Sequence, residues 1–223
     1  ARHCKLLSRE FRAERNHQVV IAIDTGHLMG ETIGGIPKLD HAINAGLLLC
    51  WYSLRAGDRV GLLGLDKDIN LFREPCGGMG AFPGLHTASA RLAYSTAETN
   101  FTLSLARLST RLRQRSLVVL ITDFVDSIGA RFMTENLQRL SRKHLILFVT
   151  IRNPDLEEAL TQKPDTVQRM ARSVVAAGIL QEREKVRGQL RRYGIQTIDA
   201  LPDQISPELL NRYLKIKRRE QIA

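Results

Sequence analysis

The chain has 223 residues, of which 43% are hydrophobic and 25% are charged, an ordinary composition for a globular protein with a sizeable core. One large domain fits this length better than two small ones. No apolar run approaches the roughly 20 residues that a membrane-spanning helix requires, and no signal peptide is visible. Within the residues given, we therefore expect a folded domain and no membrane span.

The chain carries a formal net charge of +10, and its basic residues concentrate at 183–192 and 215–219. Such patches attract nucleic acid, anionic membranes or acidic proteins. Aromatic residues make up only 5% of the chain, none is interleaved with the basic tail, and no zinc-finger or RNA-recognition motif is present. We therefore interpret these patches as solvated helical faces and expect no nucleic-acid partner.

The three cysteines, Cys4, Cys50 and Cys76, show no metal-ligand spacing. An odd number without a disulfide framework predicts reduced thiols and a cytoplasmic location. The first residue is Ala1 rather than methionine, so we expect a fragment of a longer protein. A membrane anchor, if the full-length protein has one, would lie in the missing part, and contact with a membrane is expected only through it.

Strands and helices alternate along most of the chain. Buried or alternating apolar runs predict strands at 18–24, 60–65, 69–72, 117–123, 145–150 and 195–198. Helical spacing and capping signals predict helices at 38–54, 85–94, 101–112, 131–142, 165–193 (as one helix or two) and from residue 206 onward. The glycine-rich segment 75–84 is expected to be a loop, and residues 1–17 a basic lead-in to a single domain of residues 18–223.

This order predicts an α/β fold of the Rossmann type, with a doubly wound, mostly parallel sheet covered by helices on both faces. The short turn at 66–68 joins two strands closely enough for an antiparallel hairpin, so residues 69–72 are expected to form an antiparallel edge strand.

Two of the buried strands end on an aspartate, at Asp24 and Asp123, and a hydroxyl-rich segment around Thr99 lies between them in sequence. In open α/β sheets, ligands gather beyond the carboxyl ends of the strands. If the two strands are neighbours, these three side chains converge, and their oxygens suit Mg²⁺. The alternative is that the carboxylates only accept hydrogen bonds from loop amides and hydroxyls.

These residues resemble the metal-ion-dependent adhesion site of a von Willebrand factor A (VWA) domain, over about residues 18–200. In that family an Asp-x-Ser-x-Ser motif, a distant threonine and a second aspartate bind a divalent ion. Asp24, Thr99 and Asp123 match three of these positions, but Gly26 and Leu28 replace the two serines. The resemblance therefore implies a degenerate site with weakly bound Mg²⁺, at a dissociation constant of roughly 10⁻⁴–10⁻³ M.

Within this group the chain is most similar to the bacterial domain-of-unknown-function family 58. The likeness rests on residues 8–11 and 14–16 and on the strand that leads into Asp24. It implies a non-enzymatic interaction module that works with a MoxR-type AAA+ ATPase in chaperone-like assembly, and a longer protein with membrane-spanning segments before this portion. The residues expected to contact the partner are Thr25, Gly26, His27, Asn100 and Asp126.

Two other functions stay open. A magnesium-dependent phosphoryl hydrolase also holds its metal with aspartates at strand ends, although the second aspartate expected two residues after a nucleophilic Asp24 is missing. Nucleic-acid binding through the basic C-terminal helix is the other. No Gly-x-Ser-x-Gly elbow and no His/Cys pairing marks a nucleophile.

Overall fold

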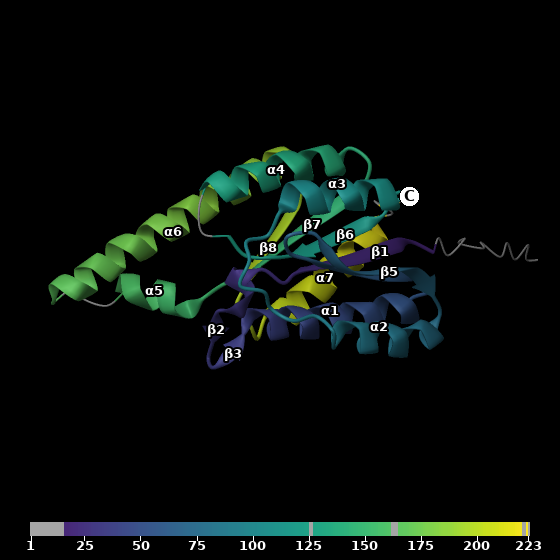
Figure 1. Cartoon of the computed structure of the whole chain (residues 1–223), viewed down its shortest axis with the longest axis horizontal. Coiled ribbons are helices and arrows are strands. Elements are labelled where there is room, and N and C mark those ends of the chain that lie inside the picture. The colour runs from purple at the N-terminus through teal and green to yellow at the C-terminus, as the bar shows by residue number, and fades with distance from the viewer. Residues whose placement is uncertain (1–15, 125–126, 162–164, 220–221, 223) are drawn as a thin grey trace, which may run out of the picture.

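The computed structural model describes residues 16–124, 127–161, 165–219 and 222, and these form a six-stranded sheet between two layers of helices (Figure 1). The strand order is β5-β4-β1-β6-β7-β8, parallel throughout except for the antiparallel pair β4/β5. The predicted doubly wound sheet with an antiparallel edge strand is confirmed. The strands are β1 (Gln18–Asp24), β4 (Arg59–Leu65), β5 (Ile69–Gly77), β6 (Leu117–Ile121), β7 (Leu145–Ile151) and β8 (Gln196–Ala200).

Each face of the sheet has its own hydrophobic core. Side chains alternate along β1, so Val19, Ile21 and Ile23 enter one core while Val20 and Ala22 enter the other. The first core contains α1 (Lys38–Arg55), α2 (Phe82–Ser89) and α7 (Ile205–Arg218), and the second contains α3 (Phe101–Arg111), α4 (Ser127–Ser141) and the C-terminal half of α6 (Val167–Arg192). Burial on both faces explains why β1 is a continuous apolar run.

Three smaller elements and one hairpin complete the fold. β2 (Thr32–Ile33) and β3 (Ile36–Pro37) form a two-stranded hairpin, and η1 (His27–Gly30) and η2 (Met79–Ala81) are short 3₁₀ helices. α5 (Pro154–Thr161) packs against the N-terminal half of α6, and together they project beyond the sheet (Figure 1). The interpretation of 165–193 left one or two helices open, and the structure has one.

The edge strand and the following helix depart from their predicted bounds. β5 runs to Gly77, through part of the expected loop, because a register shift opposite Gly61 accommodates Pro75, which cannot donate a ladder hydrogen bond. α2 starts earlier and stops at Ser89, so the helix predicted for 85–94 was wrong at both ends. Leu92 instead packs so closely over Gly64 that a Cβ there would lie 2.4 Å from it.

No helix within the described ranges is long and apolar enough to cross a membrane. The predicted lead-in of residues 1–17 lies almost wholly outside the described residues, so the division of the chain at residue 18 stays a prediction.

Candidate functional site

The two predicted aspartates and Thr99 come together at the carboxyl edge of the sheet. β1 and β6 are parallel neighbours, with Ile23 opposite Ile121, so the chain leaves both strands at the same place. The Thr99 hydroxyl donates a hydrogen bond of 2.6 Å to Asp24 Oδ1. The predicted convergence of these three side chains is confirmed.

The Asp24 carboxylate is only 2% exposed and is held by neutral donors. Its Oδ1 accepts hydrogen bonds from Thr99 and, at 2.9 Å, from the Gly26 amide, and its Oδ2 accepts one of 2.5 Å from the Thr122 hydroxyl. Burial raises the pKa of Asp24 and the nearby charge of Asp123 adds to the rise, although the three hydrogen bonds oppose it. Burial dominates, so ionised Asp24 costs stability.

The Asp123 carboxylate, in contrast, is bound by two cationic side chains of the protein itself. Its Oδ2 accepts a hydrogen bond of 2.5 Å from Lys38 Nζ, and its Oδ1 accepts from the Arg183 guanidinium and from the Phe124 amide. Lys38 is 1% exposed and also pairs with Glu31, whose side chain is half exposed. Lys38 and Arg183 thus bring two positive charges to the place where a metal site was predicted.

Sequence reasoning missed both cations. Lys38 is the first residue of α1, where the helix macrodipole disfavours a positive charge, and this anomaly was a usable signal for a buried acidic partner. Arg183 belongs to the stretch 183–192 that was interpreted as a solvated face, yet it is 5% exposed. Its spacing from buried Val186 and Leu190 places it on the inner face of α6, so that interpretation was wrong for Arg183.

Gly26 stands where the family motif has its first serine, and there is no space for a serine side chain. A Cβ on Gly26 would lie 2.1 Å from Thr99 Oγ1 and 3.2 Å from Asp24 Oδ1. The Thr99 hydroxyl therefore occupies this space and bonds directly to Asp24. Leu28, at the second serine position, offers no oxygen.

The residues present do not fit a divalent ion. Both carboxylates already accept hydrogen bonds on both oxygens, and the ammonium of Lys38 supplies the positive charge beside Asp123. No group of three or more His, Cys, Asp or Glu side chains in the described ranges is arranged to hold a metal. The Mg²⁺ site therefore stays a prediction from the sequence, and the donor set described above does not favour it.

Two of the residues expected to touch a partner are buried. Thr25 is fully buried, donating to the Leu65 carbonyl at 3.2 Å and accepting from Asn70 Nδ2 at 2.7 Å. Gly26 is also buried. These two residues shape the edge of the sheet but offer a partner no surface.

The other residues expected to contact a partner are His27, Asn100 and Asp126. His27 and Asn100 are exposed, although the Asn100 side chain already accepts from the Leu103 amide and caps α3. Asp126 lies outside the described residues. Two exposed side chains were not predicted: Tyr94, 63% exposed and packed beside Gly30, and Ile36, 47% exposed on the β2/β3 hairpin. We call His27, Ile36, Tyr94 and Asn100 the edge surface.

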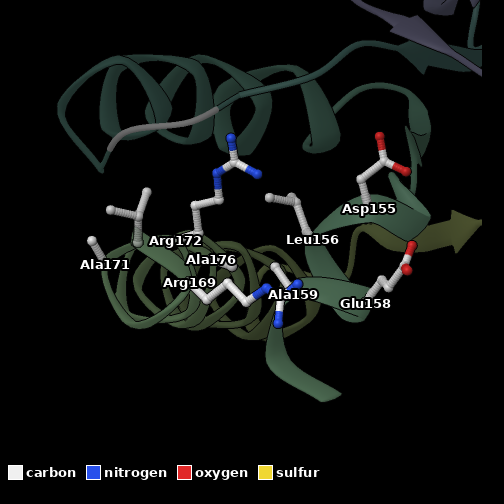
Figure 2. Close-up of a pocket in the computed structure, with 9 residues that line it drawn as sticks. Asp155, Leu156, Glu158, Ala159, Arg169, Ala171, Arg172 and Ala176 are labelled. Atoms are coloured by element: carbon white, nitrogen blue, oxygen red, sulfur yellow. The ribbon is translucent and has the colours of Figure 1, made fainter. Parts of the chain in front are cut away.

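A cavity of about 730 Å³ lies between α5 and α6, and no residue of the carboxyl edge lines it (Figure 2). Figure 2 shows Asp155 and Glu158 on α5 and Arg169 and Arg172 on α6 around this space. The cavity lies where α5 and α6 project beyond the sheet, so it is not a substrate cleft for Asp24 and Asp123.

The sheet order, the antiparallel edge strand and the acidic residues at two central strand ends define a VWA-like α/β domain. A family model described as "Protein of unknown function DUF58" matches residues 1–163, and the chain belongs to this family. The comparison with curated proteins found no match to the chain.

Solved structures with similar folds come from several sources. The conserved hypothetical protein BatB from Bacteroides thetaiotaomicron is 14% identical, with a TM-score of 0.59 over 91% of this chain and 99% of that one. The pilus adhesin SpaC from Lactobacillus rhamnosus GG is 12% identical, with a TM-score of 0.58 over 91% of this chain and 30% of that one. The SpRpn10 VWA domain has a TM-score of 0.48 at 14% identity, over 88% of this chain and 94% of that one. At these identities the likeness to BatB and SpaC shows the fold alone.

Restoring the motif serine tests the steric argument. We expect Gly26→Ser to lower the free energy of unfolding by about 1–3 kcal/mol, the usual range for overpacking, because Thr99 and Asp24 leave no space. The matched control is Gly80→Ser, since nothing lies within 4 Å of a Cβ there. Denaturant unfolding measures both. A Gly26→Ser variant as stable as the control, or one that binds Mg²⁺ tightly in a calorimetric titration, would contradict the argument.

The raised pKa of Asp24 predicts a specific pH dependence. The folded protein holds the Asp24 proton above the unfolded value of 3.8, so the contribution of this group is most favourable below that pH and declines as pH rises through the folded pKa. We therefore expect the stability of the wild type relative to Asp24→Asn to fall over the pH range that begins at 3.8 and extends upward. Thermal unfolding of both proteins across this range measures the difference, and a difference that grows with pH would refute it.

Proposed function

We propose that this chain is a non-enzymatic interaction module whose edge surface docks a protein partner without a bound metal. Membership of DUF58 and the VWA-like fold suggest an interaction module. The observation that carries the metal-independent form is the buried Lys38 ammonium, 2.5 Å from Asp123. Together with the Arg183 guanidinium, this ammonium balances the negative charge of Asp123 without a metal ion.

The exposure of the side chains at the carboxyl edge of the sheet also favours protein docking over phosphoryl hydrolysis. Asp24 is 2% exposed with both oxygens bonded, so it has no free path to a phosphoryl group. The four exposed side chains of the edge surface are instead an aromatic ring, an aliphatic side chain, an imidazole and an amide. Tyrosine is among the residues that most often dominate protein interfaces, which makes Tyr94 the expected anchor.

The partner that we propose is the MoxR-type AAA+ ATPase implied by the family resemblance, acting with this domain in chaperone-like assembly. The purified chain and a nucleotide-free MoxR-type AAA+ ATPase provide the test, with binding measured by biolayer interferometry. Omitting nucleotide lets a chelator act without removing Mg²⁺ from ATP. We expect the dissociation constant to be the same with EDTA and with added Mg²⁺.

We expect Tyr94→Ala to weaken this binding by about tenfold or more, as the loss of an interface anchor does. Tyr52→Ala is the matched control, because Tyr52 is also exposed but lies near the other end of α1. Binding that is abolished by EDTA would refute metal independence. Equal binding by both variants and the wild type would refute the edge surface as the docking face.

A further inference from the structure

Positive charge gathers at the end of the molecule opposite the α5–α6 hairpin. In this fold the helices after parallel strands run back from the carboxyl edge, so their C-terminal ends and the turns that follow meet at the amino ends of the strands (Figure 1). Five segments lie there: 55–59, 111–116, 141–144, 191–195 and 215–219. We call these five segments the basic pole.

The cations of the basic pole are exposed and largely unpaired. Those that form no ion pair with a carboxylate of the described residues include Arg113, Arg142, Lys143, Arg192, Arg218 and Arg219. The only carboxylate in the five segments is Asp58, which is fully buried. Asp58 is bonded by the Tyr213 hydroxyl at 2.5 Å and by Lys217 Nζ at 2.8 Å, so it does not offset the surface charge.

Helix capping explains only part of this charge. A basic residue in the last turn complements the helix macrodipole, as Arg55 and Arg111 do. That effect falls off within the last turn, whereas Arg113, Arg142 and Lys143 lie beyond the ends of their helices. The excess therefore needs another explanation.

We propose that the basic pole binds the surface of membranes that contain anionic phospholipids. Its cations come from helices on both faces of the sheet and so form a broad end surface, which matches a plane of negative headgroups. A cavity of about 580 Å³ beside it, lined by Arg59, Arg111 and Arg113 together with Glu74, offers a concave place for one headgroup.

Nucleic acid is the rival polyanion, and the side chains favour it less. Binding of single strands relies on aromatic platforms for stacking bases. None of the exposed aromatic side chains in the described residues lies in the five segments of the basic pole.

Vesicle co-sedimentation tests the proposal without any protein partner, so its outcome is independent of the proposed docking function. We expect the chain to sediment with vesicles of phosphatidylcholine and phosphatidylglycerol, but not with phosphatidylcholine alone, and to dissociate as salt rises. The variant reverses three pole charges: Arg113→Glu, Arg142→Glu and Lys143→Glu. The control makes the same change in net charge away from the pole, with Lys67→Glu, Arg91→Glu and Arg172→Glu, all exposed and outside the ion pairs of the described chain.

Each cation near an anionic surface is worth roughly fivefold in binding, so we expect the pole variant to bind at least about tenfold more weakly and the control to lose much less. Circular dichroism checks that both are folded. The proposal is overturned by absence of binding at physiological ionic strength, by equal loss in both variants, or by DNA binding that anionic vesicles cannot compete away.

Discussion

We expect the replacement of Lys38 by methionine to lower the free energy of unfolding by about 3–5 kcal/mol, the cost of leaving a buried carboxylate without one of its cationic partners. Methionine keeps most of the length of the side chain but removes the ammonium bonded to Asp123 and Glu31. Denaturant unfolding measures the loss. Lys185→Met is the control, because its pair with Glu182 is largely exposed and such pairs contribute about 1 kcal/mol or less.

A double-mutant cycle shows whether the effect belongs to the pair. If Lys38 acts mainly on Asp123, then Asp123→Asn costs much less in the Lys38→Met background than in the wild type. The Lys38→Met variant also offers a vacated position beside two carboxylates. We expect Mg²⁺ or Mn²⁺ to raise its melting temperature while leaving the wild type unchanged. A loss no greater than that of Lys185→Met, or a wild type stabilised by these ions, would contradict the assignment of Lys38.

The second large effect is expected at Asp58, on the opposite end of the sheet. Asp58→Ala removes the acceptor of three donors: the Tyr213 hydroxyl, the Lys217 ammonium and the His17 amide. Burial and Asp58 raise the pKa of Tyr213, so its hydroxyl stays protonated and donates. We expect a loss of about 3 kcal/mol or more, because each buried donor left without its acceptor costs about 1–3 kcal/mol.

Thermal and denaturant unfolding of Asp58→Ala measure this loss, with the exposed Asp203→Ala as the control. Tyr213→Phe should cost less than Asp58→Ala, since it removes one donor and keeps the acceptor for the other two. If Tyr213→Phe costs as much as Asp58→Ala, then the single bond from the Tyr213 hydroxyl, rather than the carboxylate shared by three donors, accounts for the loss.

Features set by local pattern could be predicted from the sequence. The apolar run 19–23 identifies a strand buried on both faces, and parallel neighbours must deliver Asp24 and Asp123 to the same edge. The end of α2 could not be predicted, because Leu92 leaves the helix to fill the space over Gly64, a contact between residues distant in sequence.

The cationic partners of Asp123 could not be predicted from the sequence either. Lys38 and Arg183 are 85 and 60 residues from Asp123 in sequence, and no motif connects them. The pattern did indicate that two carboxylates lie close together while two expected oxygen ligands are missing, so their negative charge needs another partner. Identifying that partner required knowing which helix ends and which face of α6 reach that edge.

A charge carried by a side chain cannot diffuse away. A metal at this edge would make the surface respond to the supply of free ions, filling and emptying as the concentration changed. The Lys38 ammonium, fixed to the chain and buried beside Asp123, supplies positive charge at this edge that does not depend on the divalent ion concentration. Under the proposed function, control over the timing of docking therefore falls to the partner rather than to the supply of divalent ions.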